Sequence, residues 1–332
     1  PEPIPTPESG PVLFSPGYVS SGLAERDASF SPDGDTFAFT QLEDREGTIV
    51  LLELGVPKIA PFSGVHNDLE PFFDPRGGWL WFASQRPHPD DPTREDWNIW
   101  RVEQGEEGWG EPELVRGLDG PGDEFFPTVS LEGTVAFTAE REGGLGGEDI
   151  WFAHPADDGG WTIENAGPAV NSPAPEFNAL LTPDGNQLFF SSLRPDDPRD
   201  QGGGDLYHST RGALDFEMPE REAPEAGDSE PKGTDAAAAP SAGFFFDDTP
   251  APEWTPAAPL EPYNSPALDY CPAVTPDGQY LVFTSRRTVE RELDGPEDFP
   301  LMRARLSGPG NGLDDLWWVV MPSVTEEVRT FP

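Results

Sequence analysis

The chain has 332 residues, with 62 acidic against 20 basic side chains and a formal net charge of −42. A charge of this sign excludes the basic surface that nucleic acids need, and it would repel anionic lipid. The only cysteine, Cys271, excludes a disulfide within the chain and a thiolate metal cluster.

The acidic surplus has two interpretations. Dense carboxylates stay hydrated in concentrated salt, and we favour this halophilic interpretation. The alternative is an acidic exported protein from a GC-rich genome, which would also explain why Lys58 and Lys232 are the only lysines. Because salt screens self-repulsion, the halophilic interpretation predicts a fold whose stability depends on salt.

The first ten residues, PEPIPTPESG, are rich in proline and contain no signal peptide. We interpret residues 1–10 as a tether that became exposed when an upstream segment was removed, which indicates export. No apolar run approaches the roughly 20 residues of a membrane-spanning helix. The longest run, LWWVVM at 316–321, has the length of a strand.

A five-residue turn sequence, called the PDG turn below, recurs from residue 30 onward. Its forms are FSPDG (30–34), FDPRG (73–77), VSLEG (129–133), LTPDG (181–185) and VTPDG (274–278). Proline presets the first central position of a turn, aspartate bonds the local backbone and glycine accepts a left-handed exit. Since each copy lies between two apolar runs, each predicts a β-hairpin.

The repeat extends well beyond these turns. Five residues before the start of each turn sequence stands an acid: Glu25, Asp68, Glu124, Glu176 and Asp269. Each turn is followed by a shared aromatic: Phe39, Phe82, Phe137, Phe190 and Phe283. Four residues later the chain has Glu43, Arg86, Arg141, Arg194 and Arg287. A third strand then starts at Thr48, Asn98, Asp149, Asp205 and Asp315.

Four short strands per unit, repeated at roughly fifty residues, are typical of a β-propeller. This pattern resembles the WD-repeat-like Pro-Asp repeats of TolB-like β-propellers over most of residues 11–321. The resemblance implies an all-β fold and an extracytoplasmic scaffold, either periplasmic, secreted or at the cell surface. We expect five four-stranded blades, with six as the alternative because the gap between Gly185 and Gly278 is long. The last unit ends at its third strand, so we expect the N-terminal strand to complete it and close the ring.

We expect a single propeller domain over residues 11–332, with a disordered or flexible insertion at about 217–243, which holds no strand pattern. In a four-stranded blade, the loops between strands two and three lie on the same face as the connections between blades, and the PDG turns lie on the other. The first face therefore gathers the long loops 86–96, 141–148, 194–204 and 287–314. We expect binding on this loop-rich face.

The repeated arginines are expected to pair with the residues that start the third strands. Arg86, Arg141, Arg194 and Arg287 open the loops between strands two and three, and Asn98, Asp149, Asp205 and Asp315 close them. Because the first unit lacks both, we predict that each pair staples the base of its loop. The alternative is a set of substrate-binding arginines.

The repeated acids form the candidate ligand-binding site. Glu25, Asp68, Glu124, Glu176 and Asp269 are predicted to start the innermost strands and to surround one mouth of the channel. Carboxylates gathered there would repel one another, which raises pKa values or recruits a cation. Ca²⁺ is the candidate ion, and no other cofactor is expected. The alternative is that each acid caps neighbouring backbone N–H groups.

Motifs for catalysis are absent from the sequence. The histidines, His66, His88, His154 and His208, form no metal-binding spacing, and there is no nucleophile elbow or phosphate-binding glycine loop. We therefore predict a monomeric, non-enzymatic propeller that binds a protein, peptide or envelope glycan, without nucleic-acid binding or membrane insertion. The alternative is a carbohydrate-active enzyme with paired carboxylates at the channel mouth. Trp97 and Tyr270 would then be the aromatic side chains to lie beside them.

Overall fold

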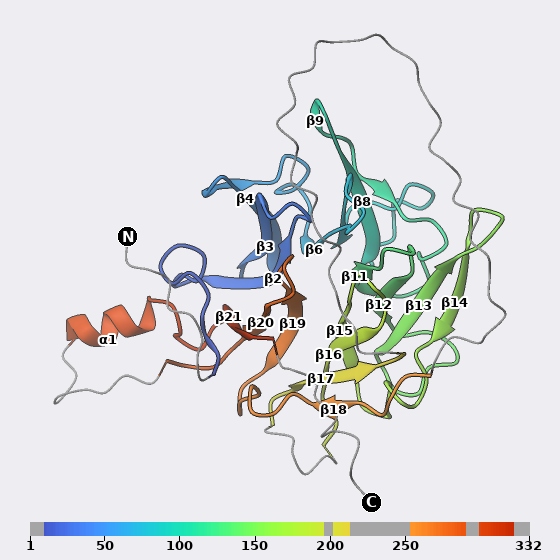
Figure 1. Cartoon of the computed structure of the whole chain (residues 1–332). Coiled ribbons are helices and arrows are strands. Elements are labelled where there is room, and N and C mark those ends of the chain that lie inside the picture. The colour runs from blue at the N-terminus through green and yellow to red at the C-terminus, as the bar shows by residue number, and fades with distance from the viewer. Residues whose placement is uncertain (1–9, 196–201, 213–252, 290–298, 322–332) are drawn as a thin grey trace, which may run out of the picture.

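The computed structural model describes residues 10–195, 202–212, 253–289 and 299–321. They form five antiparallel sheets arranged as the blades of a β-propeller, with the innermost strands nearest the centre (Figure 1). The predicted all-β fold with five blades is confirmed. The expected insertion at 217–243 and residues 1–9 of the expected tether lie outside the described residues.

Each blade begins with its innermost strand. The first blade contains β2 (Ala24–Phe30), β3 (Thr36–Glu43), β4 (Glu46–Glu53) and β5 (Val56–Ile59). The second contains β6 (Asp68–Phe73), β7 (Trp79–Ser84), β8 (Asn98–Gly105), β9 (Gly108–Trp109) and β10 (Glu113–Leu114). The third contains β11 (Glu124–Val129), β12 (Val135–Ala139), β13 (Asp149–Pro155) and β14 (Trp161–Asn165).

The fourth blade contains β15 (Glu176–Leu181), β16 (Gln187–Ser192), β17 (Asp205–Thr210) and β18 (Ala258–Pro259). The fifth contains β19 (Asp269–Val274), β20 (Tyr280–Ser285), β21 (Asp315–Val320) and, as its outermost strand, β1 (Val12–Leu13). Strand β1 pairs with β21 in antiparallel register, with Leu13 opposite Trp317. The chain start thus completes the last blade, as predicted.

The PDG turns have one backbone conformation in all five blades. Their glycines have φ between 69° and 88°, a left-handed conformation that glycine adopts at little cost. In each turn the glycine N–H donates to the residue three positions earlier, as from Gly34 to the Ser31 carbonyl at 2.8 Å. The turn chemistry expected from proline, aspartate and glycine is therefore the chemistry that forms these hairpins.

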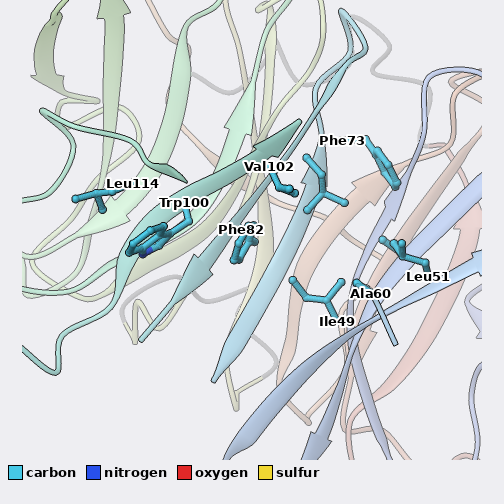
Figure 2. Packing of buried hydrophobic residues seen from close by; sticks show 10 residues of the cluster. Ile49, Leu51, Ala60, Phe73, Phe82, Trp100, Val102 and Leu114 are labelled. Atoms are coloured by element: carbon cyan, nitrogen blue, oxygen red, sulfur yellow. The ribbon is translucent and has the colours of Figure 1, made fainter. Parts of the chain in front are cut away.

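The hydrophobic core is divided among the gaps between neighbouring blades. One cluster fills the gap between the first and second blades, where Ile49 and Leu51 of β4 pack with Phe73 of β6 and Phe82 of β7 (Figure 2). Comparable clusters join the other neighbouring pairs, including the fifth blade with the first. Each blade is thus buried on both faces, and the ring forms a rigid support for the channel.

A short helix, α1 (Phe299–Leu306), lies in the long loop that precedes β21, and none of its residues is buried. Repeat patterns did not predict it, because it belongs to the loop and not to the blade. Within the described residues, no helix has the length and apolar character needed to span a membrane.

Candidate functional site

The repeated acids lie buried at the starts of the innermost strands, where they bind groups of their own blade. In the second blade the Asp68 carboxylate accepts hydrogen bonds from the hydroxyls of Ser63 (2.8 Å) and Ser84 (2.6 Å) and from the Arg86 guanidinium (2.8 Å). We call the acid, the second-strand serine and the arginine a blade clamp. The same set recurs in the fourth and fifth blades: Glu176 with Ser192 and Arg194, and Asp269 with Ser285 and Arg287.

The clamp arginines also bind the connection that enters from the preceding blade. Arg86 donates to the Phe62 carbonyl at 2.9 Å, and Arg287 donates to the Tyr263 carbonyl at 2.8 Å. The Arg86 guanidinium lies 4.9 Å from the ring centroid of Phe82, the shared aromatic four residues earlier. In the second to fifth blades the repeated Phe-to-Arg spacing therefore places the arginine on the phenylalanine ring, where it binds the connection from the preceding blade.

The predicted pairing of these arginines with the third-strand acids is wrong. Arg141 pairs with Glu124 at 2.9 Å, whereas the Asp149 carboxylate accepts hydrogen bonds from the N–H groups of Leu145 and Gly146. Asn98, Asp149, Asp205 and Asp315 are nevertheless all buried where β8, β13, β17 and β21 start. An acid at this position can accept hydrogen bonds from the backbone N–H groups of its own loop, while the arginine pairs with the acid of the innermost strand.

Two blades have an incomplete clamp. The third blade has Ala139 in place of the serine, so one oxygen of Glu124 is buried without a hydrogen-bond partner. Burial raises the pKa of Glu124 to about 7, against the opposing effect of Arg141. The first blade lacks both the serine and the arginine, with Gln41 and Glu43 in their places. There Glu25 is held by the N–H and hydroxyl of Ser21. Burial raises the pKa of Glu25 as well.

These contacts bear on the expected cation site. Among the residues that the structure describes, no three Asp, Glu, His or Cys side chains are grouped so that they could hold a metal ion. Four ring acids accept a hydrogen bond from a backbone N–H, which is the arrangement expected under the capping alternative: Glu25, Glu124, Glu176 and Asp269. Ca²⁺ binding by the ring of repeated acids stays an untested prediction.

A second ring of side chains lies two residues further along the same strands. Each innermost strand has a register shift there, and the residue at that position has φ between 48° and 61°. Such a conformation costs a non-glycine residue on the order of 1–3 kcal/mol. We call this ring the bulge layer; it consists of Asp27, Glu70, Phe126, Asn178 and Cys271.

Hydroxyl groups of the preceding blade hold three of these bulges. The N–H groups of Asp27, Glu70 and Asn178 donate to the hydroxyls of Thr284, Thr40 and Thr138. The second blade has Ala83 at the equivalent position, and the Phe126 N–H donates instead to the Glu70 carboxylate at 2.7 Å. The Glu70 carboxylate thus replaces a missing hydroxyl, which requires it to lie inside the channel.

The Arg26 guanidinium connects the bulge layer across the channel. It donates to the carboxylates of Asp27 (2.7 Å) and Glu70 (2.9 Å) and to the sulfur of Cys271 (3.3 Å). It also lies 5.0 Å from the ring centroid of Tyr270. These residues come from the first, second and fifth blades, so one buried cation links two carboxylates of unequal surroundings.

Glu70 is the centre of this network. Its carboxylate accepts hydrogen bonds from Arg26, from the Phe126 N–H and from the Asn178 side chain at 3.1 Å, which places it between four blades. The residue is only 4% exposed. Burial raises the pKa of Glu70 to about 7, although the Arg26 charge acts in the opposite direction.

A pocket of about 140 Å³ opens from the bulge layer toward the PDG turns. Its lining includes Glu70 and Phe126 of the layer, the apolar residues that follow them, and a residue from each turn: Pro32, Pro75, Leu131, Pro183 and Pro276. The pocket is therefore apolar, with one buried carboxyl at its inner end. It lies on the face opposite the loop-rich face on which the sequence predicts binding.

Comparison of the repeats could have singled out the bulge layer. The position two residues after each ring acid reads Asp, Glu, Phe, Asn and Cys, while the position that follows it holds only Ala or Pro. The backbone conformation at that position has no sequence signal, because none of the five is glycine. Divergence at this position of the repeat is thus the sequence signal for the bulge layer.

The other residues singled out in the sequence have structural surroundings. Trp97 packs against Phe125 with ring centroids 5.6 Å apart, near the loop-rich mouth. His208 is stacked on Phe189 at 4.5 Å, and burial lowers its pKa to about 4. Cys271 is a free, buried thiol, as expected for a packed inner-strand residue.

No protein-family model matches the chain, and no curated protein matches it. Among solved structures it is similar to TolB from Acinetobacter baumannii, with 13% identity, a TM-score of 0.46 and coverage of 91% of this chain. It spans 55% of the length of that TolB.

Similar scores are found for two further solved structures. A putative TolB from Agrobacterium tumefaciens has 14% identity and a TM-score of 0.45, with 90% of this chain and 91% of that chain covered. An alpha-L-arabinofuranosidase from Lactobacillus brevis has 13% identity and a TM-score of 0.45, with 91% of both chains covered. At such low identity these likenesses concern the propeller fold alone.

Proposed function

We propose that this propeller is a non-enzymatic binding protein that recognises a protein partner through the pocket between its PDG turns. The observation that carries the proposal is a concave, apolar pocket on the axis of a rigid ring, closed at its inner end by the bulge layer. Apolar side chains of a protein or peptide fit such a lining better than a hydroxyl-rich envelope glycan does. The proposed binding surface thus differs from the loop-rich face expected from the sequence.

Two leucines of the third blade can be used to test which face of the propeller binds the partner. Leu131 lines the pocket from its turn and is 45% exposed, whereas Leu145 is 41% exposed in the loop on the opposite face. We expect Leu131→Arg to abolish capture of a partner from an envelope extract of the source organism, because it places a long charged side chain at the pocket entrance. Leu145→Arg should capture as the unchanged protein does.

The readout is the amount of each captured protein, compared among the three baits in molar salt. If Leu145→Arg loses capture and Leu131→Arg keeps it, the partner binds the loop-rich face and the proposal is overturned. The proposal would also be overturned if the protein binds a glycan from a panel and both variants bind that glycan as the unchanged protein does.

One observation favours a carbohydrate-active enzyme as the second candidate. Asp27 and Glu70 contact the same guanidinium and have unequal partners, and Tyr270 lies beside them; paired-acid hydrolysis requires carboxylates in different environments. Glu70 lines the pocket, whereas Asp27 is 1% exposed and is not part of the lining, which favours binding. Turnover of any chromogenic glycoside that Glu70→Gln abolishes would establish the enzyme.

The proposal includes an extracytoplasmic location and an acidic surface adapted to salt. The resemblance of the repeats to TolB-like propellers motivates the location, and the charge of −42 motivates the adaptation to salt. Because salt screens repulsion between surface carboxylates, we expect the melting temperature to rise by several degrees between dilute buffer and molar salt. Equal melting temperatures in the two buffers would contradict the halophilic interpretation.

A further inference from the structure

The inner end of the pocket keeps room for one more hydrogen-bond donor. A carboxylate accepts about four hydrogen bonds, and Glu70 accepts three within the protein, from Arg26, Phe126 and Asn178. Two of these donors share one oxygen, while the other oxygen accepts only the Phe126 N–H. Since Glu70 also lines the pocket, a ligand that reaches its inner end meets an incompletely satisfied carboxylate.

The charges around Glu70 leave the bulge layer negative. Arg26 is the cation that contacts both Asp27 and Glu70. The thiol of Cys271 and the phenol of Tyr270 are held neutral, because burial raises the pKa of each well above its ordinary value. Asn178 and the Phe126 amide add no charge. When Glu70 is ionised, one carboxylate charge therefore stays uncompensated in the layer, and a ligand cation would neutralise it.

A further charged pair beside Tyr270 belongs to the fifth blade. The Arg286 guanidinium lies 6.0 Å from the Tyr270 ring centroid, but it is paired with Asp314 at 2.7 Å. This pair is internally neutral and leaves the charge of the bulge layer as it is.

The entrance of the pocket is acidic as well. Four of the PDG turns carry an acid directly after the pocket-lining residue: Asp33, Glu132, Asp184 and Asp277. The second turn has Arg76 there, paired with Asp74, and Arg211 donates to the Gly185 carbonyl beside the fourth turn. Acids outnumber arginines around the opening, so its field attracts a cation.

The size of the pocket limits what that cation can be. A cavity of about 150 Å³ holds a benzene molecule, and this pocket measures about 140 Å³. It accepts one side chain and not a folded element. A guanidinium would need two acceptors in a plane, whereas an ammonium on a four-carbon stem needs an apolar sleeve and one strong acceptor.

We propose that the pocket accepts a single lysine side chain of the partner protein, with its stem against the prolines and phenylalanines and its ammonium on Glu70. This inference rests on the proposed binding function and names the group that is bound. The PDG turns then have two functions: they form the hairpins, and they supply the apolar sleeve and acidic rim of a lysine site.

Hexylammonium and hexanol are matched probes, because they share the stem and differ in charge. We expect NMR titration at pH 8 in 1 M salt, which screens surface attraction, to give hexylammonium at least about tenfold tighter binding, a difference of about 1.4 kcal/mol. In Glu70→Gln the two probes should bind equally. Glu142→Gln, an exposed acid on the loop-rich face, should keep the tenfold preference.

The wild-type protein supplies a second test that needs no folded variant. Because the pKa of Glu70 is about 7, its carboxyl is mostly neutral at pH 6 and mostly charged at pH 8. The preference for hexylammonium should therefore increase from pH 6 to pH 8. Nα-acetyl-lysine methylamide should bind, and its Nε-acetylated form should not.

The possible failures can be told apart. Equal binding of hexylammonium and hexanol to the wild-type protein would overturn the lysine site and leave the apolar pocket standing. Absence of binding by both probes at millimolar concentrations would overturn the pocket itself, and the proposed function with it.

Discussion

Two rings of side chains lie two residues apart on the same innermost strands, and they differ in kind. The blade clamps keep an acid in every blade and repeat the same serine and arginine around it in the second, fourth and fifth. The bulge layer keeps its backbone conformation and changes its side chain from blade to blade. Repetition therefore marks the parts that build a blade, whereas the bulge layer, whose side chain differs in every blade, borders the pocket that we propose as the binding site.

The two rings also differ in how the charges of their carboxylates are compensated. Each clamp neutralises its acid locally, so its burial is compensated by hydrogen bonds within a few residues. The bulge layer gathers Asp27 and Glu70 around one guanidinium from different blades, which leaves a charge that a ligand can compensate. The acids of the blade clamps thus find their hydrogen-bond partners within the protein, whereas the Glu70 carboxylate of the bulge layer can accept one more hydrogen bond.

Removing a clamp acid should have the largest effect. Asp68→Ala leaves the Arg86 guanidinium buried without its anion, and loss of one partner of a buried pair costs about 3–5 kcal/mol. We expect the free energy of unfolding in urea to fall by that amount.

Glu25→Ala is the control from the first blade, where the acid binds Ser21 and is paired with no arginine. Its expected loss is about 1–3 kcal/mol, the cost of unsatisfied polar groups. Equal losses for the two variants would show that the arginine does not define the clamp.

Glu70 should make stability depend on pH in a direction opposite to that of a paired surface acid. Its pKa is raised to about 7 in the folded chain and is about 4.3 when unfolded. The folded state therefore binds the extra proton between these values, so stability falls as pH rises from about 4.5 to about 7.5. Glu70→Gln should remove a fall on the order of 1–3 kcal/mol.

The comparison is made between urea unfolding curves of the wild-type protein and Glu70→Gln at pH 5 and pH 7.5. Since the overall repulsion also grows with pH, only the difference between the two proteins reports on Glu70. A difference that does not change with pH would contradict the raised pKa.

Repair of the incomplete clamp should have the smallest effect. Ala139→Ser introduces the hydroxyl that the other clamps use, beside the Glu124 oxygen that has no hydrogen-bond partner. We expect a gain of about 1 kcal/mol in the free energy of unfolding and a lower pKa for Glu124. Ser84→Ala in the second blade is the reverse change, and a gain in stability there would contradict the assigned role of the serine.

The fold could be predicted from the sequence because its cause is local and repeated. The PDG turns, the acid five residues before each and the missing last strand together gave the five blades and the closure by β1. The partners of the arginines could not be predicted in the same way. Arg141 and Asp149 flank one loop in the sequence, but Arg141 turns back to Glu124 of the innermost strand.

The candidate site escaped prediction for two physical reasons. A β-bulge shifts the register by one residue and redirects a side chain into the channel, and Glu70 or Cys271 gives no sequence signal for this. The pocket is also formed by short proline turns, not by the long loops in which binding usually occurs. The cavity therefore opens on the face opposite the one on which the long loops predict binding.

The most direct test of the central claim is a crystal structure of the protein with hexylammonium bound in 1 M salt. We predict the ligand between the five PDG turns, with its nitrogen about 3 Å from a carboxylate oxygen of Glu70. A ligand found instead at the loop-rich mouth, beside Trp97 and Phe125, would contradict the account.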